Sequence, residues 1–361
     1  MAKTKYKREK EINFDVKNFS GDFIVMYSGG KDSTAALLYV LNYIRNYNKK
    51  NKVRVLFADT QIEHPFTYEY IDYVEKKLNI QIEHINNDGF LDVCLNKKMF
   101  PRPKTRFCTK DIKVRPFREW IYNNYVSQGK KTGKDFVVVQ GIRAEESDRR
   151  AAVYAEFNVK TYKVNYKPFS VIYWHPILDW TTQQVFDYIQ QNGLKQNKVY
   201  THLKLNRASC FPCIMSNKAE LQYIANDEQA LKRVVEMEKA LFYSRKNAKD
   251  AYTTFFMDYN KQRYITEKML EMDEVREDEE FYEAVLLYKM TEEKKKEYAA
   301  ELSKGRREQR KMLTRLKRAG SPLYDELKKY YELSKNKKKT EGAAEAATES
   351  IAKGGENGNF K

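Results

Sequence analysis

The segment Tyr27–Ser33, which reads YSGGKDS, decides what kind of fold this chain can adopt. It follows the strand-like run Phe23–Met26 and precedes the helix-like run Thr34–Tyr47. A strand, a glycine turn and a helix start form an anion site, because glycine lets the backbone approach a phosphate and the first helical N–H groups point at it. Lys31 adds a positive charge and the serines add hydroxyl donors. The segment therefore predicts binding of a phosphate, a pyrophosphate or a sulfate.

This loop differs from the P-loop of nucleotide triphosphatases. A P-loop has serine or threonine directly after its lysine, where this chain has Asp32, and an upstream glycine, where this chain has Val25. Asp32 suits a helix N-terminus, because its charge meets the positive end of the helix dipole. An ordinary strand-to-helix turn is the alternative, and the concentration of glycine, lysine and serine argues against it.

Composition restricts the class of protein. The 361 residues include 67 basic and 50 acidic side chains, for a net charge of +17. This charge favours polyanionic partners such as nucleotides or nucleic acid, and a solvated basic surface is the alternative. No run approaches the ~18 apolar residues of a membrane span, so we expect no membrane partner. The 4 cysteines are too few for a disulfide scaffold and indicate a reducing, cytoplasmic compartment.

Strand-like and helix-like runs alternate from Gly21 to Leu205. The strand-like runs are Val53–Ala58, Ile80–Ile85, Phe136–Val139 and Val171–Trp174, and the helix-like runs are Phe66–Leu78, Arg115–Val126 and Thr181–Gln191. Such alternation predicts an α/β fold, a Rossmann-like parallel sheet with helices on both faces. Ligands of these sheets bind at the carboxyl ends of the strands, so we expect Ser28–Ser33, Asp59–His64 and Gly141–Arg150 to converge on one crevice.

The pattern of the sequence changes after Cys213, from alternating strand-like and helix-like runs to mostly helix-like runs. Residues 1–20 form a charged lead-in, 21–215 the nucleotide-binding domain, 216–333 a helical basic extension, and 334–361 a tail predicted to be disordered. The Lys- and Arg-rich run Lys294–Arg318 in the extension suits a phosphate backbone, and a solvated charged helix is the alternative.

Motifs in a fixed order carry a family resemblance. They are Ser28–Ser33, Ala58–Pro65, Arg106–Thr109 with Lys113, Gly141–Ser147 with Arg149, and Pro176–Trp180. Together they resemble the phosphoadenosine phosphosulfate reductase family, within the adenine nucleotide alpha-hydrolase or PP-loop ATP pyrophosphatase superfamily. The chain also resembles the sulfur-transfer subunit of DNA phosphorothioation systems.

The resemblance implies a site for ATP or a related adenine nucleotide. Its phosphate or sulfate end would be held by Ser28, Gly29, Gly30, Lys31, Asp32 and Ser33. Asp59 and Thr60 would contact adenosine, since a carboxylate suits a ribose hydroxyl or an adenine amine, with a helix N-cap as the alternative.

A second charged segment supplies arginine forks, which suit phosphate and sulfate oxygens. The candidates there are Gly141, Arg143 and Arg149. The neighbouring Glu145, Glu146 and Asp148 suit Mg²⁺ bridging phosphates, with a surface salt-bridge cluster as the alternative. The candidate catalytic residues are Lys31, Asp32 and Arg143.

The cysteines form another candidate site, because Cys210 and Cys213 are separated by two residues. With Cys108 and Cys94 they suggest a metal site, either a [4Fe-4S] cluster, as in some members of the resembled family, or zinc. Buried free thiols and a redox pair are the alternatives.

These features lead to one principal functional hypothesis. The chain cleaves ATP to AMP and pyrophosphate and so activates an acceptor for sulfur transfer, with nucleic acid as a candidate acceptor and a sulfur-donor protein as a candidate partner. The resembled reductases use a cysteine on a C-terminal tail, and this sequence has no cysteine after Cys213. A sulfonucleotide reductase or a sulfate adenylyltransferase-like subunit is the alternative. A non-enzymatic nucleotide or nucleic-acid binding module is a further one.

Overall fold

The structure is a computed structural model of the chain. It describes residues 8–9, 14–47, 49–85, 87–147, 150–152, 161–166, 169–208, 210–245, 252–256, 259–301, 306–318, 324 and 328. The predicted tail at 334–361 lies outside these residues.

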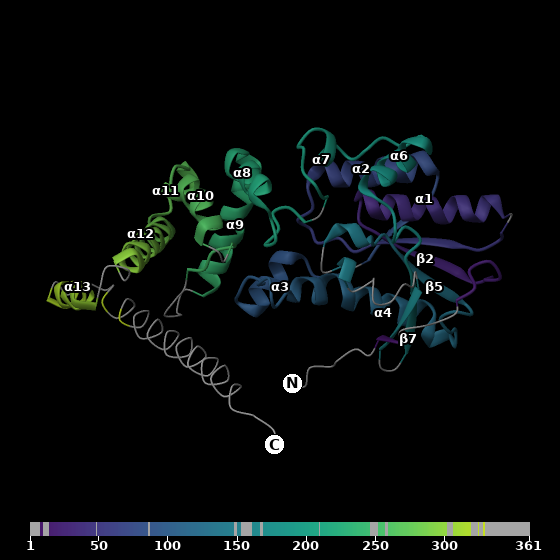
Figure 1. Cartoon of the computed structure of the whole chain (residues 1–361), viewed down its shortest axis with the longest axis horizontal. Coiled ribbons are helices and arrows are strands. Elements are labelled where there is room, and N and C mark those ends of the chain that lie inside the picture. Colours follow the sequence, from purple (N-terminus) through teal and green to yellow (C-terminus); the bar gives the residue numbers. More distant parts are fainter. Residues whose placement is uncertain are drawn as a thin grey trace, which may run out of the picture. The chain divides into compact units, whose positions relative to one another are not determined.

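A 7-stranded sheet with the order β1-β6-β7-β5-β2-β3-β4 forms the centre of the fold (Figure 1). Its strands are β1 Arg8–Glu9, β2 Asp22–Tyr27, β3 Val53–Phe57, β4 Ile82–His84, β5 Phe136–Gln140, β6 Thr161–Asn165 and β7 Ser170–Trp174. From β7 to β4 all neighbours are parallel, which confirms the predicted Rossmann-like sheet. The pairs β1–β6 and β6–β7 are antiparallel, so the sheet has a mixed edge that the sequence pattern did not predict.

Side-chain alternation along the central strands builds a core on each face of the sheet. Phe23 and Val25 of β2 point to one core, which α1 Lys31–Asn46, α2 Pro65–Leu78 and α6 Thr182–Gln191 cover. Ile24 points to the opposite core, against Phe117 and Ile121 of α4 Arg115–Asn124. Because apolar residues cover both faces, the central strands read as continuous hydrophobic runs rather than alternating ones.

The predicted helix bounds agree closely with the observed ones. Thr181 caps α6 through a hydrogen bond from the Gln184 N–H at 3.2 Å, and Gly193 has a φ of +73° just beyond the helix. A π-helical turn at Thr109–Val114 extends the predicted helix at 115 toward the N-terminus. Among the described residues, no helix is long and apolar enough to cross a membrane.

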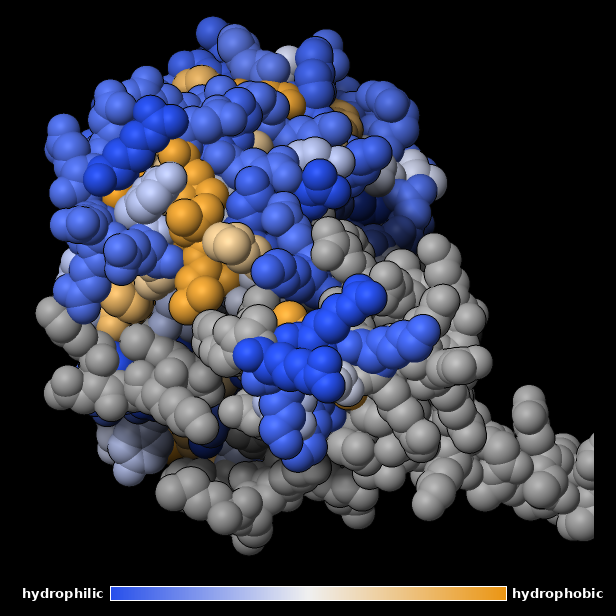
Figure 2. Space-filling model, turned by 90° about the vertical axis from the view of Figure 1, so that its left-hand side faces the viewer, coloured by the Kyte–Doolittle hydropathy of each residue, from blue (hydrophilic) through white to orange (hydrophobic). Residues whose placement is uncertain are grey.

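Helices dominate the chain beyond the sheet, as expected. They are α7 Lys198–Thr201, α8 Lys218–Asn226, α9 Glu228–Ser244, α10 Tyr259–Met269, α11 Asp273–Arg276, α12 Glu279–Glu301 and α13 Arg306–Arg318, with α3 Phe90–Lys97 lying earlier in the chain. One compact unit spans Met1–Met269 and another spans Leu270–Lys361. The first unit continues past residue 215 because Phe255 packs on Phe90 and Phe100, with ring centroids 5.8 and 5.3 Å apart. The face drawn in Figure 2 is mostly hydrophilic, with one stripe of hydrophobic side chains.

Candidate functional site

The loop between β2 and α1 has a backbone that requires glycine. Gly29 has a φ of +68°, and a Cβ added there would lie 2.8 Å from Cγ2 of Thr67. Gly30 is the N-cap of α1, with no side-chain cap. The loop therefore leads directly into the first turn of α1, whose N–H groups point toward it, which is the geometry of an anion site.

Hydrogen bonds of Ser28 and Ser33 stabilise this loop. The Oγ atoms of Ser28 and Ser33 lie 3.1 Å apart, and the Ser28 N–H donates to Ser33 Oγ at 3.2 Å. The Ser33 hydroxyl donates to the Gly30 carbonyl at 3.0 Å. Ser28 is the more exposed of the two, so its hydroxyl is better placed to meet a ligand.

Lys31 lies at the first position of α1 and is only 8% exposed. Its ammonium donates to Asp32 Oδ2 at 3.0 Å and to the Asn206 carbonyl at 3.4 Å. It also lines a cavity of about 350 Å³ together with Tyr200 and Lys204. The positive charge therefore lies between the glycine loop and an open, basic cavity.

The Tyr200 hydroxyl lies at the N-terminus of α1, a contact that the sequence pattern did not predict. It accepts hydrogen bonds from the Lys31 N–H at 3.0 Å and from the Ala208 N–H at 3.1 Å. Asn197, the N-cap of α7, donates to the Gly29 carbonyl at 3.0 Å. Local sequence carries no signal for these contacts, because about 170 residues separate the partners. The segment 197–208 therefore belongs to the candidate site.

Arg143 is 2% exposed and holds the first turn of α1 from the loop after β5. Its Nε donates to Asp32 Oδ1 at 2.5 Å, and its Nη1 donates to Glu145 Oε2 at 2.6 Å. Nη1 also donates to the Trp180 carbonyl, and Nη2 to Thr182 Oγ1, both at 3.1 Å. Burial disfavours the charge, but the bonds to Asp32 and Glu145 outweigh burial and raise the pKa of Arg143. This geometry gives Arg143 a positioning role beside the loop.

Gly141 lets these two segments approach each other. A Cβ on it would lie 2.3 Å from the Asp32 carbonyl oxygen, so only glycine fits. Downstream, Glu146 accepts from the Arg143 N–H at 3.0 Å and forms an ion pair with Arg150. Arg149 and Asp148 lie outside the described residues. Both described glutamates thus have protein partners, as in the salt-bridge alternative.

Asp59 and Thr60 follow β3 but differ in exposure. Asp59 Oδ1 accepts from the Gln61 N–H at 2.8 Å and from the Tyr68 hydroxyl at 2.7 Å. Thr60 is 2% exposed and donates to Glu63 Oε1 at 2.9 Å. Asp59 is therefore the better candidate for contacting a ligand, whereas Thr60 fixes the loop.

The described residues do not support the predicted metal site at the cysteines. Among the described residues, no three His, Cys, Asp or Glu side chains are arranged to hold one metal ion. Cys94 is fully buried in α3. The Lys113 ammonium lies 3.8 Å from Glu63. Burial disfavours its charge, but Glu63 and the nearby Cys210, Cys213 and Cys108 outweigh burial and raise the pKa of Lys113. The [4Fe-4S] and zinc hypotheses thus lack support among the described residues.

The structure is compatible with the two alternatives to a metal site, which are free cysteines and a redox pair. All four cysteines are free. The Cys210 thiol donates to Cys213, which lowers the pKa of Cys213 and raises that of Cys210. The Met215 N–H also donates to Cys213 Sγ at 3.4 Å.

Known proteins resemble this chain across its sheet domain. Residues 22–215 match the family model described as phosphoadenosine phosphosulfate reductase domain. An uncharacterized 37.8 kDa protein of Escherichia phage 186 is 29% identical over 304 residues, covering 70% of this chain and 84% of that protein. Adenosine 5'-phosphosulfate reductase of Salinibacter ruber is 22% identical, covering 56% of this chain and 71% of that protein.

Solved structures resemble it more distantly. Phosphoadenylyl-sulfate reductase of Candida auris has a TM-score of 0.34 at 16% identity, covering 50% of this chain and 77% of that one. Candida glabrata FMN adenylyltransferase has a TM-score of 0.37 at 15% identity, covering 55% of this chain and 59% of that one. The chain therefore spans less than two thirds of the adenylyltransferase.

Proposed function

Because the chain belongs to the phosphoadenosine phosphosulfate reductase domain family, we propose that it binds an adenine nucleotide at Ser28–Ser33 and cleaves ATP to AMP and pyrophosphate. The observation that carries this proposal is the buried chain of charges Lys31–Asp32–Arg143 at the start of α1. It holds the Lys31 ammonium at the start of α1 before any ligand arrives. Such preorganised charge is what a departing pyrophosphate requires.

The proposed reaction is transfer of AMP to an acceptor. An acceptor oxygen attacks the α-phosphorus, and the bond from that phosphorus to the oxygen bridging to the β-phosphate breaks. The electron pair leaves on pyrophosphate, and the acceptor proton passes to solvent. A sulfur nucleophile from a sulfur-donor protein would then attack the acceptor atom that carries this oxygen, and AMP would leave with the oxygen and the electron pair.

Each residue has a distinct task in this proposal. Lys31, the Ser28 hydroxyl and the loop N–H groups neutralise the pyrophosphate, while Asp59 orients adenosine. Asp32 and Arg143 act indirectly by holding Lys31 and the helix start. Mg²⁺ would come with the nucleotide phosphates and supply charge neutralisation between them.

We propose nucleic acid as the acceptor. Helix α13 has the sequence RREQRKMLTRLKR and carries Arg315, Lys317 and Arg318 in its last turn. A helix this basic suits a phosphate backbone. Sulfur transfer to DNA, as in DNA phosphorothioation, would be one example of such a reaction. The cytoplasmic location stays a prediction from cysteine usage.

Sulfonucleotide reduction is the second candidate, because the relative from Salinibacter ruber is named an adenosine 5'-phosphosulfate reductase. A thiolate among Cys108, Cys210 and Cys213, or a partner's thiolate, would then attack sulfur and displace the nucleotide through its phosphate oxygen. A second thiol would release sulfite from the resulting thiosulfonate and form a disulfide. Sulfite release from phosphoadenosine phosphosulfate or adenosine phosphosulfate distinguishes this reaction from ATP cleavage. Salt-dependent nucleic-acid binding without turnover of either nucleotide would instead favour a binding module.

The test is pyrophosphate release from ATP and Mg²⁺ in the presence of DNA or RNA. We expect release by the native chain, at least about 100-fold slower release by Lys31→Ala, and unchanged release by Lys77→Ala, an exposed lysine at the end of α2. Equal loss in both variants, or no release with any acceptor, would contradict the proposal.

A further inference from the structure

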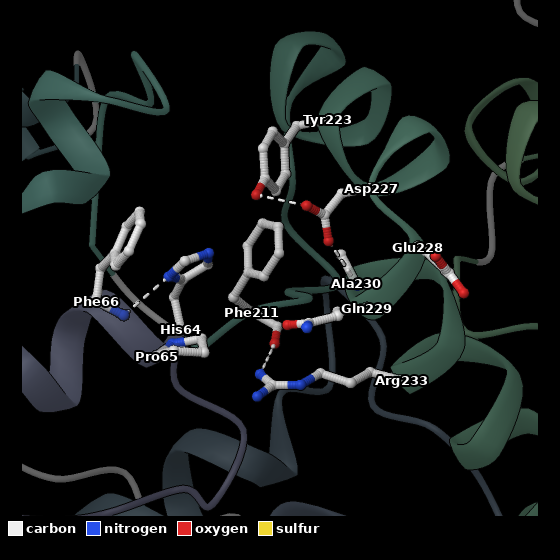
Figure 3. A pocket seen from close by; sticks show the side chains of 10 residues that line it. All are labelled: His64, Pro65, Phe66, Phe211, Tyr223, Asp227, Glu228, Gln229, Ala230 and Arg233. Atoms are coloured by element: carbon white, nitrogen blue, oxygen red, sulfur yellow. Dashed lines mark hydrogen bonds between the residues drawn. The ribbon is translucent and has the colours of Figure 1, made fainter.

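A second cavity, of about 350 Å³, lies where the start of α2, the loop at Phe211 and the helices α8 and α9 meet (Figure 3). Its lining includes His64, Phe66, Tyr223 and Arg233. It shares no lining residue with the cavity at Lys31. This volume lies at the small end of ligand pockets and admits a single small ligand.

Aromatic rings form a continuous row along this cavity. The ring centroids of Phe66 and His64 are 4.9 Å apart, those of His64 and Phe211 5.2 Å, and those of Phe211 and Tyr223 5.6 Å. In Figure 3 the Phe211 ring lies between His64 and Tyr223. Phe66 and Tyr223 are only partly buried, so part of each ring is accessible. The Lys198 ammonium lies 5.0 Å from the Phe66 ring centroid, so a base that stacks on Phe66 would use the other face of the ring.

Hydrogen bonds hold these rings in place. The Tyr223 hydroxyl donates to Asp227 Oδ2 at 2.9 Å, and Asp227 Oδ1 accepts from the Ala230 N–H at 2.9 Å. His64 Nδ1 accepts from the Phe66 N–H at 3.1 Å, which places the ring proton on Nε2. Burial, followed by the nearby Arg233, lowers the pKa of His64 to about 4, so the ring is neutral at pH 7.

Polar groups around the rings offer both donors and acceptors. Arg233 Nη1 donates to the carbonyls of Glu63 and Phe211 at 3.0 and 3.3 Å, so the guanidinium is fixed with its other nitrogens available. Each oxygen of Asp227 retains a further lone pair, and Gln229 adds an amide. This mixture suits a heterocycle with ring nitrogens and amino groups better than a hydrocarbon.

We propose that this aromatic cavity binds a nucleobase, at a site separate from the glycine loop. The base would stack on the rings of Phe66 and Tyr223 and form hydrogen bonds with Asp227 or Arg233, in the way that single-stranded nucleic acid is held on aromatic side chains. The base belongs either to a free nucleotide or to a nucleic-acid strand. The net charge of +17 suits the phosphate of either source.

The experiment uses 2-aminopurine, whose fluorescence is quenched by stacking. The full chain is titrated into 2-aminopurine riboside and, separately, into a single-stranded DNA oligonucleotide that contains one 2-aminopurine. We expect quenching that weakens about tenfold or more in Phe66→Leu and in Tyr223→Leu, because base–aromatic stacking is lost. Phe66→Trp retains a stacking face and should keep the quenching.

Controls separate this site from the glycine loop and from general surface contacts. Tyr122→Leu removes a tyrosine that is 42% exposed on α4 and should leave binding unchanged. Lys31→Ala should also leave the quenching unchanged, so a failure of the proposed ATP reaction does not affect this test. Quenching by both probes indicates a free base as ligand, and quenching by the oligonucleotide alone indicates a strand. No quenching, or quenching that Phe66→Leu and Tyr223→Leu leave intact, would overturn the proposal.

Discussion

The Nε of Arg143 donates to Oδ1 of Asp32 at 2.5 Å, across 111 residues of sequence. The other carboxylate oxygen of Asp32 accepts from the Lys31 ammonium at 3.0 Å. One partly buried carboxylate therefore joins two cations, one from the loop after β5 and one from the start of α1. This link sets the position of Lys31 without any ligand.

Arg143→Ala should destabilise the chain. It leaves Asp32 and Glu145 without their cation, and breaking a buried charge pair costs about 3–5 kcal/mol. The loss rests on the Asp32 pair, because Asp32 is 16% exposed whereas Glu145 is 49% exposed and can be solvated; we expect the lower end, about 3 kcal/mol, in urea unfolding. Arg150→Ala, at a 43% exposed arginine paired with Glu146, should cost less than about 1 kcal/mol. Equal losses would contradict the positioning role of Arg143.

Gly29→Ala should cost more than Gly129→Ala. Both glycines have positive φ, at +68° and +75°, so alanine is strained at each by about 1–3 kcal/mol. Only at Gly29 would the new Cβ also press on Thr67, at 2.8 Å, whereas no atom lies within 4 Å at Gly129. Urea unfolding measures the stability difference, and ATP titration should show lost binding in Gly29→Ala alone. Normal ATP affinity in that variant would indicate a site elsewhere.

Tyr200→Phe should destabilise the chain less when ATP is bound. The substitution leaves the N–H groups of Lys31 and Ala208 without their acceptor, at about 1–3 kcal/mol. A phosphate at the start of α1 can accept from the Lys31 N–H. The difference in unfolding temperature between Tyr200→Phe and the native chain should therefore be smaller at saturating ATP. Thermal unfolding with and without ATP measures this. Tyr47→Phe, at a 58% exposed tyrosine, is the matched control.

Glu238 should make stability fall as pH rises. Burial raises its pKa from 4.5 to about 7, although the Phe255 N–H, the Tyr252 hydroxyl and the Gln262 amide donate to it. Between pH 4.5 and about 7 the folded chain therefore holds a proton on Glu238 that the unfolded chain has lost. The contribution of this proton to folding stability is complete below pH 4.5 and is lost as the pH rises through about 7.

Unfolding in urea at pH 5.5 and pH 8 tests this window. Glu238→Gln has no carboxyl group to titrate at this position. Its free energy of unfolding should therefore fall less between pH 5.5 and pH 8 than that of the native chain. The same pH dependence in both proteins would exclude Glu238 as its source.

The sequence predicted the parts of the fold that depend on neighbouring residues. Apolar runs such as Phe136–Val139 identified the parallel strands, and glycine and lysine at 29–31 identified the loop. Contacts between distant residues were not predictable, because no local pattern encodes them. The Tyr200 hydroxyl at α1 and the carboxylate partner of Arg143 are of this kind.

The antiparallel edge was missed for a different reason. Strand β6 reads TYKVN, with polar residues at alternate positions, and its register depends on β7, which pairs Val164 with Val171.

The cysteine spacing did not predict how the thiols are grouped in space. Among the described residues, no three potential ligand side chains gather around one point.

A crystal structure with a non-hydrolysable ATP analogue and Mg²⁺ tests the central claim most directly. Our account predicts the triphosphate against the N–H groups and hydroxyls of Ser28–Ser33, with the Lys31 ammonium in contact with its β- or γ-phosphate. A triphosphate bound elsewhere, with the Ser28–Ser33 backbone touching no ligand, would contradict it.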